Sequence, residues 1–261
     1  MGDETSFGDV GVRLDVSGVA TATIHRPPDN YFDMALIASI ADAYEHLDTD
    51  TAARAIVLRA EGKHFCAGAR LAPPDTSRGG SGGGRHLYDE ALRLFACRLP
   101  VVAAVQGAAI GGGLGLALSA DFRVGSSQTR MSANFARLGF HHGFALTVTL
   151  PAVVGQQRAN EMLLTGVRLD GEEAHRIGLL DRLVDPADVD AAAHALAADI
   201  AASGPLAVRS IRETMRRGLV DMVRDATARE RAEQERLMIT SDFAEGVTAT
   251  RERRMPRFEG S

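Results

Sequence analysis

The feature that most constrains this chain is a pattern that occurs twice: an apolar, β-branched run that ends in a turn of small residues. Residues 55–58 (Ala-Ile-Val-Leu) lead to 65–69 (Phe-Cys-Ala-Gly-Ala), and residues 101–105 (Val-Val-Ala-Ala-Val) lead to 107–115, which contain five glycines. A strand that ends in such a turn and opens a helix leaves backbone N–H groups pointing outward. Glycine and alanine let a substrate carbonyl approach those groups closely. Two such turns that face one point would form an oxyanion hole.

Composition narrows the class of protein. The 261 residues are 45% hydrophobic, which suffices for one large core, and the net charge is −5 with acidic and basic residues interspersed. With no basic stripe and no Trp, nucleic-acid binding is not expected. No apolar run reaches the length of a membrane span and no signal-peptide pattern opens the chain, so a cytoplasmic protein is expected. Cys66 and Cys97 form neither a metal motif nor a disulfide framework, and no metal site is expected.

Hydrophobic periodicity predicts an alternating series of strands and helices. The expected strands are 12–16, 19–24, 55–59, 101–105 and 122–125, and the expected helices are 34–47, 87–97 and 112–119. Beyond about residue 155 the chain is expected to be mainly helical, with one long, solvated helix over 224–238. The sequence therefore predicts an α/β core over residues 1–200 and a C-terminal helical region over 201–261. The apolar faces of that region require a partner surface, for which a second subunit is the candidate.

The glycine-rich turns do not match nucleotide-binding motifs. Residues 111–115 do not complete G-x-G-x-x-G because Leu116 stands at the last position, and residues 79–84 lack the Lys-Ser/Thr of a phosphate-binding loop. Each turn taken alone is better explained as a tight strand-to-helix connection that binds nothing.

Taken together, however, five motifs in order resemble the crotonase superfamily, the enoyl-CoA hydratase/isomerase group. Residues 65–70 resemble aromatic-(Ser/Ala/Cys)-Ala-Gly-X-Asp, and residues 107–113 resemble Gly-(Tyr/Ala)-X-X-Gly-Gly-Gly. Further matches are residues 163–166, 173–180 and 245–258. This resemblance covers nearly the whole chain. It implies a spiral of ββα repeats, a C-terminal helical region used in trimerisation, a homotrimer or hexamer, and acyl-CoA substrates, with coenzyme A as part of the substrate and no separate cofactor.

The resemblance places two oxyanion amides on Ala69 and Gly112. Such amides donate to a thioester carbonyl as it gains negative charge, and removal of one donor typically costs about 3–4 kcal/mol. The resemblance also implies contacts with the substrate or its CoA part from Ala67, Gly68, Arg70, Leu71, Gly111 and Pro28. Arg70 could pair with a carboxylate or phosphate of the ligand, or lie in solvent.

The chain departs from the family pattern where acid–base chemistry is expected. Hydratases of this family resemble one another in carrying two glutamates, and the corresponding positions here are Gly115 and Phe135. Arg70 replaces the aspartate of the first motif, and Asn134 replaces the proline before the second glutamate. Positioned acid–base groups typically contribute about 10²–10⁴ in rate each. Conventional hydration by two glutamates is therefore not supported by the sequence.

Two histidines are candidates to replace the glutamates. His141 and His142 precede Gly143 where the family has X-Pro-Gly, in a loop that the resemblance places beside the acyl pocket. A neutral imidazole is a good base near neutral pH. The alternative is that both are loop histidines exposed to solvent or bonded to backbone. His64 is expected to lie outside the pocket, and Asp121 is expected to be structural.

Two functional classes follow from these residues. In the first, the protein is an enzyme on acyl-CoA, nominally a lyase of the enoyl-CoA hydratase type, with other thioester reactions as alternatives: isomerisation, decarboxylation, hydrolysis or carbon–carbon cleavage. Decarboxylation requires an oxyanion hole but less of a base, so it survives the loss of both glutamates. In the second class the protein binds acyl-CoA without catalysis or assembles with an active homologue, which Phe135 favours.

Overall fold

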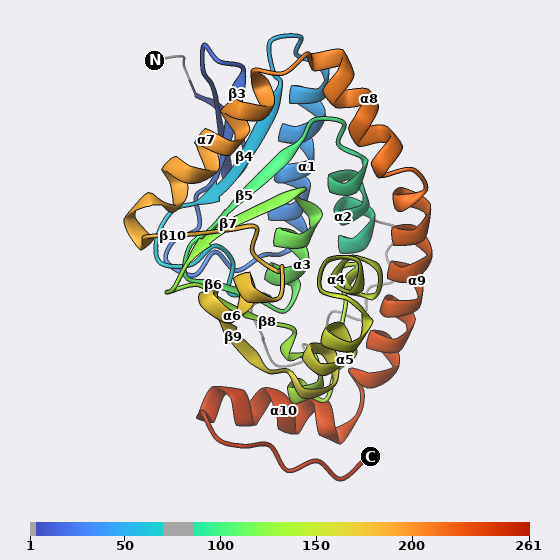
Figure 1. Ribbon diagram of the computed structural model, residues 1–261. Coiled ribbons are helices and arrows are strands. Elements are labelled where there is room, and N and C mark those ends of the chain that lie inside the picture. Colours follow the sequence, from blue (N-terminus) through green and yellow to red (C-terminus); the bar gives the residue numbers. More distant parts are fainter. Residues whose placement is uncertain (1–3, 70–85) are drawn as a thin grey trace.

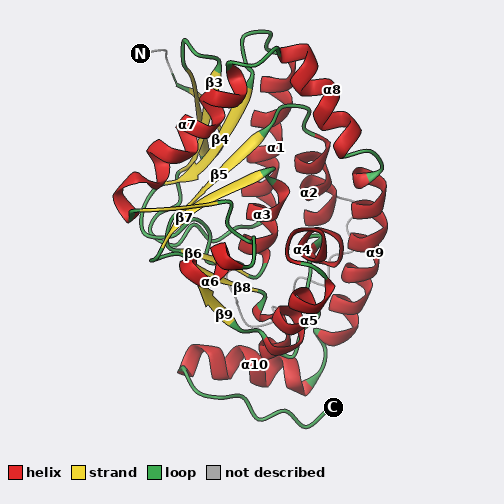
Figure 2. Ribbon diagram, in the orientation of Figure 1, coloured by secondary structure: helices red, strands yellow, loops and turns green. Residues whose placement is uncertain are grey.

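The computed structural model describes residues 4–69 and 86–261 and has a seven-stranded sheet at its centre (Figures 1 and 2). Two antiparallel pairings join the first three strands, and the remaining pairings are parallel. The spatial order is β1 (Thr5–Phe7), β2 (Val10–Leu14), β3 (Val19–Ile24), β4 (Ala55–Ala60), β5 (Val101–Val105), β7 (Phe122–Ser126) and β10 (Arg182–Val184). A second sheet has the order β6 (Ala108–Ile110), β8 (Arg130–Ser132) and β9 (Arg168–Asp170).

Ten α-helices occur in the described residues: α1 (Met34–Thr49), α2 (Leu87–Ala96), α3 (Gly112–Ser119), α4 (Leu146–Val154), α5 (Gln156–Thr165), α6 (Gly171–Arg176), α7 (Val189–Ala201), α8 (Pro205–Met215), α9 (Leu219–Leu237) and α10 (Ser241–Glu252). Two 3₁₀ turns, η2 (Asn134–Leu138) and η3 (Pro186–Asp188), complete the series. The predicted α/β class is therefore confirmed, and strands β9 and β10 interrupt the part that was expected to be mainly helical.

The β2–β3 hairpin follows directly from its turn residues. Asp15 Oδ1 accepts hydrogen bonds from the N–H groups of Ser17 and Val19, and Gly18 has a φ of +85°. A short polar side chain that bonds the backbone two residues on is typical of such turns. The hairpin begins at Val10, two residues before the predicted start.

The central strands are apolar throughout because both faces of the sheet are covered. On β4, Ala55 and Val57 face α7, whereas Ile56 and Leu58 join the larger core beneath α1, α2 and α3. Figure 1 shows α7 alone on one face of the sheet and the helices α1, α2 and α3 on the other. Parallel strands that are buried on both sides read as continuous hydrophobic runs, as the sequence of β5 does.

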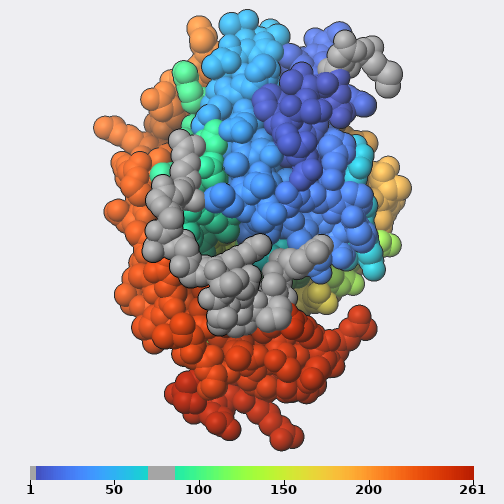
Figure 3. Space-filling view, turned by 180° about the vertical axis from the view of Figure 1, so that it is seen from behind, coloured from blue at the N-terminus to red at the C-terminus, as the bar shows by residue number. Residues whose placement is uncertain are grey.

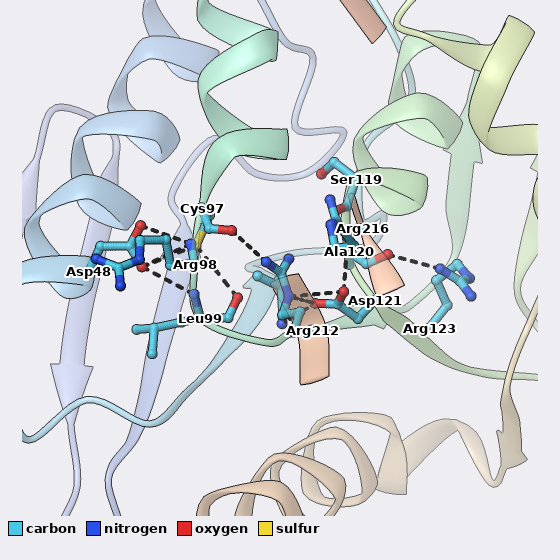
Figure 4. A network of polar contacts seen from close by, with 11 residues as sticks. Asp48, Cys97, Arg98, Leu99, Ser119, Ala120, Asp121, Arg123, Arg212 and Arg216 are labelled. Carbon is cyan, nitrogen blue, oxygen red and sulfur yellow. Dashed lines mark hydrogen bonds and ion pairs between the residues drawn. The ribbon is translucent and has the colours of Figure 1, made fainter. Parts of the chain in front are cut away.

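The C-terminal helices wrap around the core, and one polar network fixes α8 to it (Figure 4). Asp121 accepts from the backbone N–H of Val101 at 2.8 Å and pairs with Arg212 and Arg216 at 2.9 Å each. Arg212 also donates to the carbonyl of Cys97 at 2.5 Å. All three charged side chains are largely buried, so the predicted structural role of Asp121 is confirmed.

Helices α9 and α10 form one side and one end of the molecule (Figures 1 and 3). The sequence predicted a solvated helix over 224–238, but one face of α9 is buried. Val223, Thr227 and Glu230 form a buried stripe along it. Among the described residues no single helix is long and apolar enough to cross a bilayer. One helix pair, 186–201 with 205–215, meets the length and composition requirement together but is bent by 105°.

Candidate active site

One cavity of about 610 Å³ is lined by six of the predicted site residues: Ala67, Gly68, Ala69, Gly111, Gly112 and Phe135. Its described wall combines small backbone positions, aromatic rings and a few polar groups. The lining residues are Asp29, Tyr31, Phe32, His64, Ala67, Gly68, Ala69, Leu87, Tyr88, Ala108, Ile110, Gly111, Gly112, Asn134, Phe135, Leu138, Phe140, Gly143, Phe144, Arg168, Gln234, Thr250 and Arg251. The cavity thus lies where both glycine turns, α2, η2 and the C-terminal helices meet.

The first turn leaves the N–H of Ala69 directed away from its strand neighbour. The Gly68 carbonyl accepts from the N–H of Phe32 at 3.0 Å. Across a trans peptide the carbonyl and the next N–H point in opposite directions, so the Ala69 N–H points away from Phe32. Ala69 itself is an exposed residue on the cavity wall.

The second turn directs the N–H of Gly112 out of the N-terminus of α3. The Gly111 carbonyl accepts from Leu114 and Gly115 within the first helical turn, so the N–H across the same peptide unit points backwards along the helix axis. The Gly111 N–H, in contrast, is used by the carbonyl of Ser132 at 2.8 Å. Helix N-termini attract negative charge, so this amide can stabilise an oxyanion.

Two glycines of these turns are required by the backbone. Gly68 has a φ of +97°, and a Cβ there would lie 2.9 Å from the carbonyl oxygen of Ile110. Gly111 has a φ of +58°. Residues with side chains rarely adopt such conformations, which explains the glycines without reference to a ligand.

Aromatic rings fill the space at Gly115 and Phe135, the two positions at which the resemblance predicts glutamates. A Cβ on Gly115 would lie 2.5 Å from the Cβ of Phe144, so no larger side chain fits there. Phe135 lies on the cavity wall, is 8% exposed and stacks on Phe140 with ring centroids 6.5 Å apart. Phe32 contacts Phe144 edge to face at 5.7 Å. This part of the cavity is therefore apolar.

Neither His141 nor His142 is among the described residues that line the cavity. Their rings stack at 4.2 Å, and His141 Nδ1 lies 2.8 Å from the carbonyl oxygen of His142. His142 Nε2 contacts the Thr147 hydroxyl at 2.9 Å. Burial, and secondarily the charge of His141, lower the pKa of His142 to about 4. Their role in acid–base chemistry stays a prediction.

A buried glutamate holds the loop that follows these histidines. Glu230 of α9 is 0% exposed and accepts from the N–H groups of Ala145 and Thr147 at 2.9 and 3.0 Å and from the Thr147 hydroxyl at 2.6 Å. Phe144 and Ala145 both have positive φ, of 61° and 62°. Burial raises the pKa of Glu230, whereas these hydrogen bonds oppose the rise. This carboxylate therefore fixes the unusual turn that places the Phe144 ring over Gly115.

His64 lies on the cavity wall, contrary to the expectation that it lies outside the pocket. Its Nδ1 accepts from the N–H of Ala108 at 3.1 Å, and its Nε2 lies 3.9 Å from Asp29 Oδ1. Burial lowers the pKa of His64, which favours the neutral ring. In that form Nδ1 is already an acceptor and Nε2 carries the proton, so the ring can donate but has no free lone pair for use as a base.

Sequence reasoning missed a tyrosine in the cavity. Tyr88 of α2 is 8% exposed, and its hydroxyl donates to Gln234 Oε1 at 2.7 Å. Gln234 Nε2 in turn donates to the carbonyl of His141 at 3.0 Å. Burial, followed by the charge of Glu230, raises the pKa of Tyr88, whereas Gln234 and the backbone of Phe144 oppose the rise. Tyr88 was hidden because it joins the cavity only through packing between α2 and α9.

The remaining predicted contacts divide into three groups. Ala67, Gly68 and Gly111 line the cavity together with Ala69 and Gly112. Pro28 is not among the lining residues, and its carbonyl accepts from the N–H groups of Lys63 and His64. Arg70 and Leu71 lie outside the described residues. In the described part of the chain, no group of three or more His, Cys, Asp or Glu side chains could hold a metal ion.

Comparison with known proteins agrees with this architecture. The enoyl-CoA hydratase/isomerase family matches residues 15–261. A probable enoyl-CoA hydratase of Bacillus subtilis (strain 168) is 30% identical, over 93% of this chain and 95% of its own length. A putative enoyl-CoA hydratase of Thermus thermophilus is 33% identical, over 95% and 100% respectively.

Solved structures of enoyl-CoA hydratases and isomerases are also similar to this chain. The enoyl-CoA hydratase/isomerase of Pseudoalteromonas atlantica T6c superposes with a TM-score of 0.87 at 31% identity and covers 96% of this chain and 100% of its own. An enoyl-CoA hydratase of Mycobacterium avium subsp. paratuberculosis K-10 gives a TM-score of 0.83 at 28% identity, with coverage of 97% and 99%. By sequence and by fold, this chain belongs to the enoyl-CoA hydratase/isomerase family of the crotonase superfamily.

Proposed function

We propose that this protein is an acyl-CoA thioester-processing enzyme in which the amides of Ala69 and Gly112 polarise the thioester carbonyl. The observation that supports the proposal is that Ala69 and Gly112, each with an N–H directed out of its own turn, line one cavity with an otherwise largely apolar wall. Such a pair stabilises the negative charge that develops in an enolate or a tetrahedral adduct. Coenzyme A enters as part of the substrate, and no further cofactor is proposed.

The nominal reaction is that of the family, hydration or isomerisation of a 2-enoyl-CoA. The wall of the cavity does not favour the two-glutamate form of this reaction, because Phe135 and Phe144 occupy the corresponding space. A reaction that forms a thioester enolate without a carboxylate base fits the site better. The same two rings support a second candidate, a protein that binds acyl-CoA without turnover.

The first experiment is ultraviolet monitoring of crotonyl-CoA and a longer 2-enoyl-CoA, with binding measured by calorimetry. A glutamate-bearing family member is the positive control. Loss of the conjugated thioester absorbance at a rate comparable to that control would show hydration without the glutamates. Binding with no change in absorbance would refute hydratase activity and leave another thioester reaction or a binding role.

The histidine hypothesis has its own test. If His141 or His142 transfers protons, the His141→Ala/His142→Ala double variant loses turnover while CoA-ester binding stays nearly intact. Unchanged turnover in the double variant would refute this role. We propose a cytoplasmic homotrimer or hexamer as the working assembly, which sedimentation of the purified protein would test.

A further inference from the structure

A second cavity, of about 750 Å³, borders the cavity proposed to hold the thioester. The two share His64, Ala108 and Arg168 on their described walls. No residue of the turns at 65–69 and 111–115 lines the second cavity. It is therefore a neighbour of the thioester cavity and not an extension of the two glycine turns.

The second cavity lies outside the carboxyl ends of parallel strands. Strand β4 ends at Ala60, β7 ends at Ser126, and Gln106 directly follows β5, and all three residues line the cavity. Strand β5 pairs in parallel with both β4 and β7, so these ends meet at one edge of the sheet. In open α/β sheets this edge is the usual place for a ligand.

The first turn of α7 forms another side of the second cavity. Val189 and Asp190 begin this helix and line the cavity. Asp188, the N-cap residue, makes no side-chain hydrogen bond to the helix amides. The N-terminus of a helix carries a partial positive charge, so α7 adds to the attraction that the cavity exerts on an anion.

The wall of the second cavity concentrates positive charge in a chain whose net charge is −5. Its described lysine and arginine residues are Arg59, Lys63, Arg130 and Arg168. Asp190 is the one carboxylate among the described lining residues. Like charges held close together repel one another, and a bound anion would relieve this repulsion.

The single carboxylate serves only one of these cations. Arg59 Nη2 lies 2.8 Å from Asp190 Oδ2. Arg130 Nη1 donates to two backbone carbonyls of its own turn, at 2.7 and 2.8 Å, and has no carboxylate partner in the described chain. The Lys63 and Arg168 side chains have no hydrogen bond or ion pair with a described residue. Three positive charges on this wall therefore lack a counter-charge.

The same wall is polar and has no platform for a nucleobase. Arg59 Nε and Gln106 Oε1 are buried without a hydrogen-bond partner among the described residues. Such atoms are rare in native proteins, so the described protein groups do not complete this wall by themselves. No Phe or Tyr is among the described lining residues, whereas bases are commonly bound by stacking on aromatic rings. These features favour a compact ligand without a base.

We propose that the second cavity binds a compact oxyanion that carries two or more negative charges on phosphate or carboxylate groups. Guanidinium groups bind both acid groups through the same paired N–H geometry. The cavity volume falls within the range of about 300–1,000 Å³ that is typical of small-molecule sites. This site is additional to the thioester cavity and does not depend on the reaction that occurs there.

Calorimetry of the full-length protein at low ionic strength, with inorganic diphosphate and with citrate as probes, tests the proposal. At least one probe should bind with one-to-one stoichiometry, and its affinity should fall as salt is added. Orthophosphate should bind about 10-fold more weakly or worse, because it can engage fewer of the cations. ADP should bind no more tightly than diphosphate, because the wall offers its base no aromatic ring.

Lys63→Gln and Arg130→Gln each remove one cation that lacks a counter-charge. Each should weaken the anion about 10-fold or more, since a hydrogen bond to a charged group contributes at least that much. Lys63 is exposed, so its replacement leaves the core intact. Arg130 does not line the thioester cavity, so Arg130→Gln should bind CoA esters as the wild type does.

Arg158→Gln is the matched control. Arg158 lies on α5, pairs with Glu161 at the surface and is not among the described residues that line the second cavity. This variant changes the net charge of the protein by the same amount as the other two. It should keep the wild-type affinity for the anion.

NMR of the histidine rings locates the bound anion. The charged groups that face His64 are Asp29, Lys63 and Arg168. Burial lowers the pKa of His64, the two cations lower it further, and Asp29 opposes them. An anion bound beside the cations would offset their effect, so the pKa of His64 should rise when the anion binds. Resonances of His46, on α1 outside the cavity, should not respond.

Several results would overturn the proposal. One is that neither diphosphate nor citrate binds, and another is that ADP binds 10-fold more tightly than diphosphate, which would mean that the site recognises a nucleoside. Competitive displacement of the anion by a CoA ester would place the anion in the thioester cavity. Equal effects of Arg158→Gln and Lys63→Gln, or an unmoved pKa of His64, would show that the anion is not held by this wall.

The outcomes also separate this inference from the proposed function. CoA-ester binding without binding of either anion overturns the inference and leaves the thioester site standing. Anion binding that responds to Lys63→Gln and Arg130→Gln, in a protein that binds no CoA ester, supports the inference and refutes the proposed function.

Discussion

The side chain of Phe144 closes the space over Gly115, so that a Cβ on the glycine would lie 2.5 Å from the Phe144 Cβ. Introducing a glutamate at Gly115, where the resemblance to the family predicts one, is therefore not a conservative change. Because overpacking of a well-filled core typically costs about 1–3 kcal/mol, Gly115→Glu should lower the free energy of unfolding by at least that amount. Burial of the carboxylate adds to the loss. Denaturant titration would measure it.

The control for this substitution is Gly204→Ser. Gly204 is the N-cap of α8, a Cβ there would make an ordinary contact of 3.9 Å with the Ala207 Cβ, and serine is a favourable residue at a helix N-cap. Its stability should stay within about 0.5 kcal/mol of wild type. A Gly115→Glu protein as stable as wild type, or one that gains hydratase activity, would contradict the close packing of Phe144.

Gly112→Ala should impair turnover of whichever thioester the wild-type protein processes. A Cβ at this position would overlap the ring of Phe32, so either the ring or the amide must move. Misplacement of one oxyanion donor is expected to reduce the rate about 10²–10³-fold. Combining it with Phe32→Leu, which makes room, should restore part of the rate. Comparing the rates of wild type, the two single variants and the double variant measures the coupling between Gly112 and Phe32. If the two losses in rate are additive, the Phe32 contact is not the cause of the Gly112→Ala defect.

The partly buried imidazole of His142 should make stability depend on pH. Its folded pKa of about 4 is lower than the ordinary value of 6.5, because burial disfavours the charged ring. The unfolded chain therefore takes up the proton first, and the stabilisation present above pH 6.5 is lost as the pH falls to 4. The loss amounts to roughly 3 kcal/mol at most, since one pKa unit corresponds to about 1.4 kcal/mol.

Denaturant titrations of wild type and His142→Gln between pH 4 and 7 would isolate this contribution. Glutamine keeps an N–H donor for the Thr147 hydroxyl but does not titrate in this range. The free energy of unfolding of wild type, relative to that of His142→Gln, should decrease as the pH falls from 6.5 to 4. Parallel curves would mean that His142 titrates normally in the folded protein.

Asp121→Asn should loosen α8 from the core. The carboxylate faces both Arg212 and Arg216, and burial already lowers the pKa of Arg216. Removing the counter-charge from partly buried arginines should cost about 3 kcal/mol in unfolding free energy. Asp221→Asn, which removes an exposed partner of Arg224, should change it by less than about 1 kcal/mol. Equal effects in thermal denaturation would show that the Asp121 network adds no more than a surface pair.

The sequence by itself determined the α/β class, the strands at 101–105 and 19–24, and the helix at 112–119, because these follow from local periodicity and turn chemistry. The resemblance to the family placed two amides on Ala69 and Gly112, and both residues line the cavity, while their role as oxyanion donors stays a prediction. Tertiary structure decided everything that depends on distant elements meeting. Packing of α2 against α9 brought Tyr88 to Gln234, the buried stripe of α9 placed Glu230 beneath the 143–147 turn, and that turn directed Phe144 onto Gly115. No local pattern encodes such contacts, because the partners are distant in the sequence: Tyr88 and Gln234 lie 146 residues apart.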